Sequence, residues 1–444
     1  MRLCWLERDC PFCARRRWGL GVPTVTIQAF SGGAGCGKTY QLMRALSAHL
    51  EASPLAEGQK VLALTFMHGS RRRLEERLAQ VPLLRKRANC TTLDSFAWSL
   101  VRRWRSLASR LGHADIDPSQ YDRVCNAAGD LVQIAEVRAW VAGSYPILLV
   151  DEAQDLTAAR LRLVQGLAMR LQVFVAADEF QCLDEQLRPN PACTWLQEVC
   201  QAEELNQPQR TNVAELLEAA AAIRAGQPPH TGNMFKVQLT PRPPLAGAWL
   251  NGNLRYYGGG RSVAIITPSL GTFARSALTW SAANTTSNGA GPYAVAWEES
   301  ESKAASAFID GLALQDMNDI PSVTALLADA GDPRVVREVT DWMDVQRRAR
   351  SKSTFSKDEI TKAIDQVFSQ RRRISKGVDR GWRAMTVHGA KNREFDNVIL
   401  LWPAAVVGSD DQKRRLLYNA VTRAKSRCLV LVQAGAQMAR PPFA

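Results

Sequence analysis

The sequence predicts an α/β protein with two parallel-sheet domains and short, mostly helical insertions. The chain has 444 residues, which is more than a single hydrophobic core usually organises. Short apolar runs alternate with segments whose apolar residues recur at helical spacing. This alternation occurs once in the first half of the chain and again in the second half. Such a pattern is typical of parallel sheets whose strands are joined by helices.

The first domain is expected over residues 24–204. It begins with a strand, TVTIQAF (Thr24–Phe30), and continues through a glycine-rich turn into a helix from Tyr40 to Ala52. A short helical insertion is expected over about 97–146, before the middle strands of the domain. The remaining apolar runs predict buried strands, each followed by a helical pattern: Val61–Phe66, Ile147–Val150 and Val173–Ala176.

The second domain is expected over residues 205–444. A longer, mostly helical insertion is expected within it, over about 298–380. Residues 1–23, which precede the first strand, are expected to form a mobile N-terminal extension. The apolar runs that predict strands of the second domain are Ser262–Thr267, Val398–Trp402 and Cys428–Val432.

The chain is strongly basic, with a formal net charge of +13 and a sequence pI of about 9.5. Eleven Lys and Arg stand against three Asp and Glu between Gly69 and Arg110, and fourteen stand against seven between Arg334 and Arg383. Two separate basic stretches suit a polyanion that crosses both domains, such as a nucleic acid. Composition alone leaves open the alternative of a soluble protein that is merely basic.

The sequence contains no run of 18 apolar residues that would predict a membrane span, and its start lacks the apolar core of a secretory signal. Ten scattered cysteines fit a reduced, cytoplasmic protein. Cys4, Cys10 and Cys13 lie close together, but a metal site would need a fourth ligand, and Cys36 belongs to the glycine-rich turn. Free thiols are the favoured interpretation, and metal binding by these three residues stays open.

The glycine-rich turn carries a phosphate-binding motif. Its sequence, GGAGCGKT, fits the pattern G-x-x-x-x-G-K-[ST] and lies between a predicted strand and a predicted helix. Backbone N–H groups of such a loop approach phosphate, its lysine contacts the β and γ oxygens, and its hydroxyl ligates Mg²⁺. ATP and Mg²⁺ are therefore the expected ligands of Gly32, Gly33, Ala34, Gly35, Cys36, Gly37, Lys38 and Thr39.

The run ILLVDEAQD ends a predicted strand in two adjacent carboxylates. Asp151 is expected to complete the Mg²⁺ shell with Thr39, and Glu152 is expected to orient and deprotonate an attacking water. An Asp-Glu pair after a strand can also simply meet the dipole of the next helix. Because the pair follows a phosphate loop by about 110 residues, we favour the catalytic interpretation and predict hydrolysis of a nucleoside triphosphate.

Six motifs together resemble the UvrD/Rep/PcrA type of superfamily-one helicase. They are VLALTF, DEAQD, ADEFQ, QRT, TVHGAKNREF and LYNAVTRAK, and the resemblance extends from about Ile27 to Val432. It implies two RecA-like domains of the P-loop NTPase class, with ATP in the cleft between them. It also implies that single-stranded DNA lies across both domains.

The resemblance assigns further residues to the nucleotide. Gln181 would sense the γ-phosphate, and Arg210 and Arg423 would reach the same phosphate from the second domain. Glu394 would lie near the sugar. An arginine that is supplied across a cleft stabilises charge in the transition state and couples domain closure to hydrolysis. For Arg423, the alternative is a solvated helix residue without a role.

The resemblance also implies a nucleic-acid track. Phe66 would stack on a base, although it could instead be a core residue that ends a strand. His388 would lie near the strand, although a structural histidine is an equal alternative. The residues assigned to the nucleic acid are Phe66, Thr92, Ser95, Thr386, His388 and Lys391.

Several positions depart from the resemblance. Asp94 replaces the histidine of the family in TLDSF. Gln209 replaces an aromatic residue that stacks on adenine, and the usual glutamine ahead of the phosphate loop is missing, so GTP or other triphosphates could be accepted. The family's aromatic platform after Gln181 is also missing, which leaves Trp195 as a candidate substitute.

The sequence therefore predicts an ATP-dependent translocase or helicase on single-stranded DNA, DNA junctions or tailed duplexes, with 3′ to 5′ polarity by resemblance. The reduced insertions keep a second interpretation open, a DNA-stimulated ATPase subunit beside a nuclease or repair protein in phage defence or recombination. A small-molecule kinase would explain neither the basic stretches nor Arg423. A motor on RNA also stays open, because residues that would read a 2′-hydroxyl are not identifiable.

Overall fold

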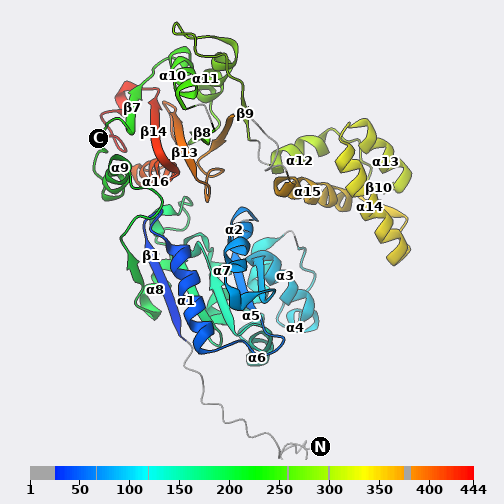
Figure 1. Cartoon of the computed structure of the whole chain (residues 1–444). Helices are drawn as coiled ribbons and strands as arrows, with labels where there is room; N and C mark the ends of the chain where they lie inside the picture. The colour runs from blue at the N-terminus through cyan, green and yellow to red at the C-terminus, as the bar shows by residue number, and fades with distance from the viewer. Residues whose placement is uncertain (1–25, 67, 119, 258–259, 299–300, 375–381) are drawn as a thin grey trace, which may run out of the picture. The chain divides into compact units, whose positions relative to one another are not determined.

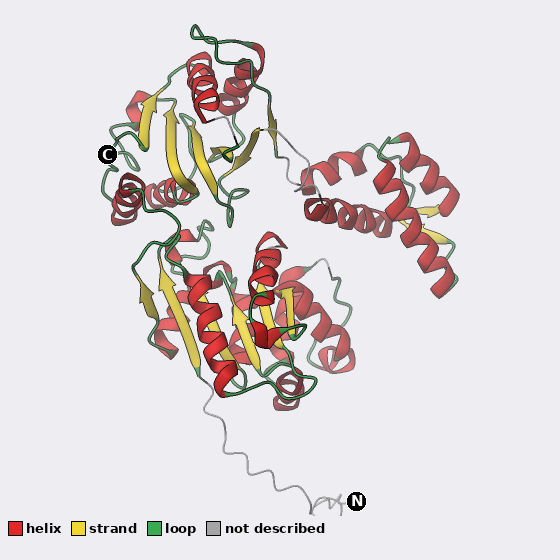
Figure 2. Cartoon of the chain, in the orientation of Figure 1, coloured by secondary structure: helices red, strands yellow, loops and turns green. Residues whose placement is uncertain are grey.

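The computed structural model describes residues 26–444 apart from 67, 119, 258–259, 299–300 and 375–381. The chain divides into two compact units, Met1–Gln207 and Pro208–Ala444. Each unit contains a six-stranded parallel sheet with helices around it, which confirms the predicted α/β fold class (Figures 1 and 2). The extension expected over 1–23 lies outside the described residues.

The sheet of the first unit has the strand order β3-β2-β4-β5-β1-β6, with every neighbouring pair parallel. Alternate residues of a strand serve the two faces: Leu62 and Leu64 enter one hydrophobic core, and Val61 and Ala63 enter another. The sheet is therefore buried on both faces, as parallel sheets usually are. Its strands are β1 (Ile27–Gly32), β2 (Val61–Thr65), β3 (Ala88–Thr92), β4 (Ile147–Val150), β5 (Gln172–Ala177) and β6 (Glu203–Leu205).

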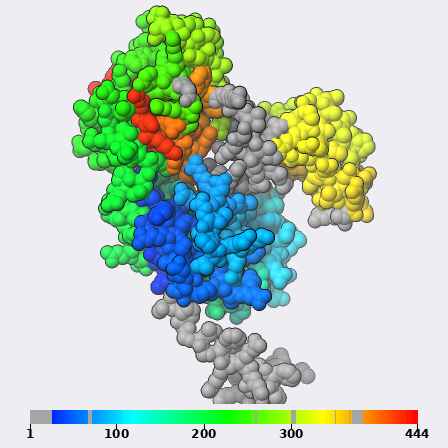
Figure 3. Space-filling model, in the orientation of Figure 1, coloured from blue at the N-terminus to red at the C-terminus, as the bar shows by residue number. Residues whose placement is uncertain are grey.

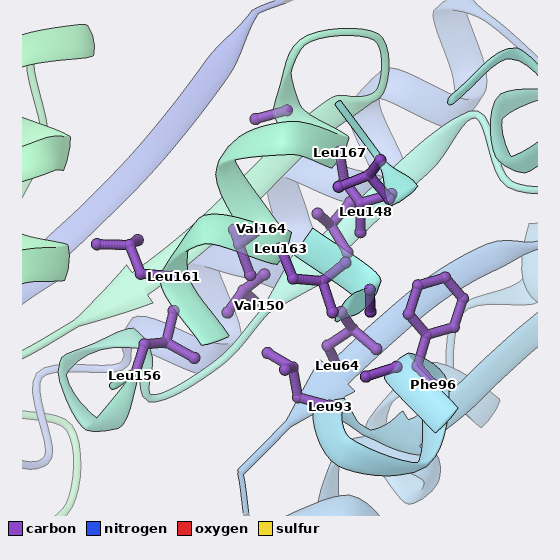
Figure 4. Close-up of a cluster of buried hydrophobic side chains, with 14 of the residues drawn as sticks. Leu64, Leu93, Phe96, Leu148, Val150, Leu156, Leu161, Leu163, Val164 and Leu167 are labelled. Atoms are coloured by element: carbon purple, nitrogen blue, oxygen red, sulfur yellow. The ribbon is translucent and has the colours of Figure 1, made fainter. Parts of the chain in front are cut away.

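Helices α1 and α2 cover one face of this sheet, and they form the blue surface of the first unit in Figure 3. On the other face, Phe96 of α3 and Leu163 of α7 join Leu64 and Leu148 of the sheet in one core (Figure 4). The helices are α1 (Lys38–Ala52), α2 (His68–Ala79), α3 (Leu93–Arg103), α4 (Arg105–Arg110), α5 (Tyr121–Leu131), α6 (Ala135–Ser144), α7 (Ala158–Ala168) and α8 (Pro191–Val199).

The stretch expected to be a helical insertion, about 97–146, holds the short helices α4, α5 and α6. Val124 and Leu131 of α5 are buried in the same core as α3 and α7, and so are Val137 and Val141 of α6. These helices therefore add a layer to the first unit and have no separate core of their own within the described residues.

Apolar runs identified the central strands β2, β4 and β5 but missed β3 and β6. Both missed strands lie at the edges of the sheet. An edge strand has a neighbour on one side only, so polar residues are tolerated there. Consistent with this, β3 reads ANCTT and β6 reads EEL.

The sheet of the second unit has the order β7-β14-β13-β8-β12-β9 and is also parallel throughout. Helices α10 and α11 pack on one face of it, while α9 and α16 contact each other and β14. Its elements are β7 (Phe235–Leu239), β8 (Val263–Thr267), β9 (Val295–Trp297), β12 (Trp382–Thr386), β13 (Phe395–Trp402), β14 (Ala424–Val432), α9 (Ala214–Ala225), α10 (Pro243–Tyr257), α11 (Thr272–Ala283) and α16 (Asp410–Val421).

The insertion of the second unit is mostly helical, as predicted. Buried residues such as Val339, Met343, Phe355 and Ile364 form a hydrophobic core within this segment alone. It consists of α12 (Glu301–Asp310), β10 (Met317–Asp319), α13 (Ile320–Asp329), α14 (Pro333–Arg350), β11 (Thr354–Ser356) and α15 (Lys357–Ile374).

Candidate nucleotide site and nucleic-acid residues

The phosphate loop connects the end of β1 to the start of α1. Gly35 and Gly37 have φ of 82° and 79°, a left-handed conformation that favours glycine. Gly32 pairs with Leu205 of β6, and a Cβ on Gly32 would lie 2.5 Å from the carbonyl oxygen of Leu205. The loop residues Gly33, Ala34 and Cys36 are half-buried. The backbone therefore forms a tight turn in which glycine is required.

Lys38, the first residue of α1, folds back over this turn. Its side chain is buried, and Nζ donates to the carbonyl oxygens of Gly32 at 2.8 Å and Gly33 at 3.0 Å. The same Nζ lies 3.7 Å from Oδ2 of Asp178, which follows β5. The ammonium group of Lys38 is thus held inside the loop, where it could form an ion pair with a bound phosphate group.

Thr39 and Asp151 meet at the carboxyl edge of the sheet, as a magnesium site requires. Thr39 Oγ1 donates to Asp151 Oδ2 at 3.2 Å. The surrounding protein and the neighbouring Glu152 raise the pKa of Asp151 to about 7, although part of the Asp151 side chain retains solvent contact. A divalent cation would offset the negative charge of the two carboxylates. The hydroxyl of Thr39 and the carboxylate of Asp151 are hard oxygen ligands of the kind that Mg²⁺ prefers. These residues therefore fit Mg²⁺.

Glu152 is held in an uncommon backbone conformation next to this pair. Its φ of 61° and ψ of 43° are left-handed, which is rare for a residue other than glycine and clusters at functional sites. Gln154 Nε2 donates to Glu152 Oε2, and Gln154 Oε1 accepts from the backbone N–H of Asp178 at 2.9 Å. Gln154 thereby fixes Glu152 relative to the end of β5.

Gln181 reaches the same network through Asp178. Its Nε2 donates to Asp178 Oδ2 at 2.7 Å, and both side chains are buried. Sequence reasoning selected Gln181 and Glu152 but passed over Asp178 and Gln154, which connect them. Both lie inside the motifs ADEFQ and DEAQD, so a signal was present, but their role as connectors appears only once β4 and β5 are adjacent.

The predicted nucleotide residues of the second unit also lie together. Arg210 Nη1 donates to the carbonyl oxygen of Thr422 at 2.7 Å, and its Nε forms an ion pair with Glu394 Oε1 at 3.0 Å. Lys425 Nζ lies 3.2 Å from the other oxygen of Glu394. Burial alone would raise the pKa of Glu394, but the cations Arg210 and Lys425 lower it. Glu394 is therefore a carboxylate that orients Arg210.

Arg423 follows α16 and immediately precedes β14. Only 2% of its surface is exposed, so the alternative of a solvated helix residue is wrong. Its Nε donates to the carbonyl oxygen of Asn419 at 3.0 Å, and its Nη1 donates to that of Arg393 at 3.5 Å. Arg393 precedes Glu394, so the chain brings Arg423, Glu394 and Arg210 into one cluster.

Phe66 directly follows β2 and is 37% exposed. The alternative of a core phenylalanine is therefore wrong. Thr92 is buried and caps α3, because its Oγ1 accepts from the Ser95 backbone N–H at 3.2 Å, while Ser95 itself is exposed. Phe66, Thr92 and Ser95 all lie where β2 and β3 end, which is the same edge of the sheet as the phosphate loop.

In the second unit, Thr386 ends β12 and begins a turn. Thr386 Oγ1 accepts from the backbone N–H of Gly389 at 3.1 Å, and the backbone N–H of Lys391 donates to the carbonyl oxygen of His388 at 3.2 Å. His388 is exposed and Lys391 is half-buried. The turn thus displays these side chains at the carboxyl end of a strand.

Trp195 does not fit the role of a substitute stacking platform. It lies on α8, is 9% exposed and packs into the core of the first unit. Cys4, Cys10 and Cys13 lie outside the described residues, and the described part of the chain contains no group of three or more His, Cys, Asp or Glu placed to hold a metal. Among the described helices, none combines the length and the apolar character needed to cross a membrane.

Two protein-family models match this chain, one in each unit. Residues 23–185 match the AAA domain model AAA_19, and they include the phosphate loop, Asp151, Glu152 and Gln181. Residues 381–431 match the UvrD-like helicase C-terminal domain, and they include Thr386, Glu394 and Arg423. A search of curated proteins finds no match.

Solved structures of the arterivirus nonstructural protein 10 (helicase), alone and in complex with DNA, are remotely similar. Each is 12% identical with a TM-score of 0.39, and the alignments cover 94% and 93% of this chain. The chain spans 62% of the length of those arterivirus chains. So remote a likeness carries no argument about mechanism. Together, the two family matches support the resemblance of this chain to UvrD-like superfamily-one helicases that its motifs indicate.

Proposed function

We propose that the protein is an ATP-dependent motor that moves along single-stranded DNA and separates strands at tailed duplexes or junctions. The observation that carries this proposal is the contact between Thr39 and Asp151, 3.2 Å apart. It assembles a magnesium-binding pair on the edge of the sheet that also presents the exposed ring of Phe66. A nucleotide site and a base-stacking residue on one edge suit a motor that couples the two.

The first unit would bind the triphosphate and activate water. Lys38 would move from the carbonyl oxygens of its own loop to the β and γ oxygens of ATP. Thr39 and Asp151 would hold Mg²⁺, which supplies positive charge to the phosphate oxygens. Glu152, oriented by Gln154, would accept the proton of the attacking water, and Gln181 would contact the γ-phosphate.

The second unit would complete the site when the two units close on ATP. Arg210 and Arg423 would stabilise the charge that spreads over the γ-phosphate in the transition state. The ion pair of Arg210 with Glu394 and the carbonyl contacts of Arg423 would keep both guanidinium groups in position before closure. Glu394 would in addition lie near the sugar of ATP.

The nucleic-acid residues would alternate their grip with this closure. Phe66 and Ser95 of the first unit and Thr386, His388 and Lys391 of the second would contact the strand, and Thr92 would act by capping α3. Repeated closing and opening would advance the protein along the strand. The 3′ to 5′ direction follows from the resemblance to UvrD, Rep and PcrA.

Nucleotide hydrolysis measured against single-stranded DNA, duplex DNA and RNA tests this proposal. We expect stimulation by single-stranded DNA and its loss in Lys38→Ala. Strand displacement from a 3′-tailed duplex, compared with a 5′-tailed one, tests direction. Equal hydrolysis rates with and without every nucleic acid would contradict the motor. Because Gln209 is an exposed amide in place of a stacking ring, GTP should be accepted beside ATP.

A second candidate is a DNA-stimulated ATPase subunit that works beside a nuclease or repair protein. It is supported by the helices α4, α5 and α6, which pack into the core of the first unit and, within the described residues, form no separate subdomain that could engage a duplex. The seven described cysteines form no disulfide, which fits a reduced protein. Unwinding by the purified chain alone would exclude this candidate.

A further inference from the structure

We propose that Arg160 is a positioning residue for base stacking: its guanidinium, anchored by Asp94 and Asp122, supports the ring of Phe66 against which a nucleobase packs. The inference rests on the proposed function, because it takes a single strand as the ligand. It assigns a role to Asp94, which stands where the resemblance leads one to expect histidine.

The guanidinium of Arg160 is anchored at the starts of three helices. Its Nε donates to Asp94 Oδ1 at 2.9 Å, and its Nη1 donates to Asp122 Oδ1 at 2.9 Å. Arg160 itself lies in the first turn of α7, and its Nη1 also contacts Thr157 Oγ1 at 3.0 Å. Asp94 lies in the first turn of α3 and Asp122 in that of α5. One planar donor group therefore joins α3, α5 and α7.

A second contact fixes Asp94. The Sγ of Cys125, a buried residue of α5, lies 3.4 Å from Asp94 Oδ1. Burial and then the Asp94 carboxylate raise the pKa of Cys125 to about 12, so the thiol keeps its proton and can donate. The Asp94 carboxylate is thus contacted by both Cys125 and Arg160. Because it is fixed, its hydrogen bond also restrains the guanidinium of Arg160.

The carboxylates beside Arg160 disfavour a phosphate as its ligand. Burial alone would lower the pKa of Arg160, but Asp94 above all raises it, so the guanidinium stays charged. Two carboxylates within hydrogen-bond distance outweigh that single positive charge. Their negative charge would repel a phosphate, so a contribution of Arg160 to strand binding is favoured through a neutral group.

Phe66 is that neutral group. The Arg160 Cζ lies over its ring, 5.3 Å from the ring centroid, within the range of a cation–π contact. The side chain of Arg160 is 9% exposed, whereas Phe66 is 37% exposed. The guanidinium therefore covers one face of the ring from inside the protein and restrains it. The solvent-facing part of the ring is left for a base.

The test measures strand affinity of the full-length chain by fluorescence anisotropy. Labelled oligothymidylate is compared with an abasic deoxyribose-phosphate strand of equal length and charge. Arg160→Gln should bind oligothymidylate about tenfold more weakly than wild type, the size of a partial stacking loss. It should bind the abasic strand like wild type. Arg160→Lys, which keeps a cation but not the planar fork, should recover only part of the loss.

Two comparisons separate positioning from a general effect. In a Phe66→Leu background, Arg160→Gln should add no further loss on oligothymidylate, because both changes remove one interaction. Arg162→Gln, on the same helix, breaks an ion pair with Asp130 that does not involve the ring, and should leave the affinity for both strands unchanged.

Equal losses on the two strands, or additive losses in the double variant, would overturn the inference while the proposed function stands. If Arg160→Gln does not fold, Asp122→Asn removes one anchor only, and should weaken binding of oligothymidylate but not of the abasic strand. A wild-type chain that binds neither strand would overturn the proposed function, and the inference with it.

Discussion

The hydroxyl of Thr39 donates to the carboxylate of Asp151 at 3.2 Å, although 112 residues separate them. The contact joins the first turn of α1 to the end of β4. In the sheet, only β5 lies between β4 and β1, the strand that precedes α1. Burial and the neighbouring Glu152 raise the pKa of Asp151 by more than the cation Lys38 lowers it. The site is therefore short of positive charge.

This shortage makes magnesium-dependent nucleotide binding sensitive to pH. The pKa of Asp151 is raised to about 7, so a proton competes with Mg²⁺ for the carboxylate near neutrality. We expect the affinity for Mg²⁺ and a fluorescent ATP analogue to rise between about pH 6 and pH 8. Asp151→Asn should bind weakly and show no such rise. An unchanged slope in that variant would assign the titration to another group.

The same shift affects stability in the opposite direction. A carboxyl whose pKa is higher in the folded than in the unfolded state stabilises the fold while it is protonated. That contribution is complete below the ordinary pKa of 3.8 and is lost as pH rises through about 7. Without Mg²⁺ and nucleotide, the free energy of unfolding of wild type relative to Asp151→Asn should therefore fall over this range. Urea denaturation at several pH values measures it.

Gln154 should matter for both stability and turnover. Its side chain is fully buried and links Glu152 to the backbone N–H of Asp178, and its backbone carbonyl oxygen accepts from Asn190 Nδ2 at 2.8 Å. Gln154→Leu keeps the volume but leaves a buried N–H unpaired, at a cost of about 1–3 kcal/mol. The kcat should fall more than nucleotide affinity, because Glu152 loses its orienting donor. Urea denaturation with steady-state kinetics separates the two effects, and wild-type kcat would contradict this role.

Gly32→Ala should disrupt the junction of β1 with β6. The added Cβ would lie 2.5 Å from the carbonyl oxygen of Leu205, which cannot move without breaking the strand pairing. We expect a loss of about 2–3 kcal/mol in unfolding free energy and weaker nucleotide binding. Gly58→Ala is a control: the φ values of Gly32 and Gly58 are both positive, 156° and 79°, but nothing lies within 4 Å of a Cβ built on Gly58. It should cost about 1 kcal/mol. Equal losses would contradict the close-approach argument.

Glu394→Gln distinguishes two roles for this carboxylate. If Glu394 chiefly binds the sugar, the variant should raise the KM for ATP. The ion pair with Arg210 at 3.0 Å favours an orienting role, so we expect kcat to fall with little change in KM. Asp396→Asn, a nearby carboxylate that instead accepts from Ser262, serves as the control. Steady-state kinetics at saturating single-stranded DNA checks this.

The parts of the fold that follow from the sequence are those where one local pattern determines the result. Ile147–Val150 is buried along its whole length, so four consecutive apolar residues identify β4. Gly32 to Thr39 needs glycine at fixed positions, so the motif identifies the loop. Edge strands such as β3 and β6 lack an apolar run. Each has a neighbouring strand on one side only, so polar residues are tolerated there.

Connections between motifs could not be predicted from local patterns. Asp178 and Gln154 contact neighbours that β4 and β5 bring together, and Arg160 is anchored by two carboxylates that lie 66 and 38 residues away in the sequence. Trp195 failed as a stacking candidate because helical spacing cannot say whether a tryptophan faces the core or the solvent. Tertiary packing decides each of these cases.

We propose that Arg423, on the second unit, acts on the nucleotide that the first unit binds. The most direct test is Arg423→Ala, with Arg423→Lys beside it, measured for ATP affinity and for turnover stimulated by single-stranded DNA. Because Arg423 is buried and bonded to the carbonyl oxygens of Asn419 and Arg393, circular dichroism must first show that each variant is folded. We predict ATP affinity within about threefold of wild type and a loss of turnover of at least about a hundredfold. A folded Arg423→Ala that turns over ATP at the wild-type rate would contradict the two-unit site.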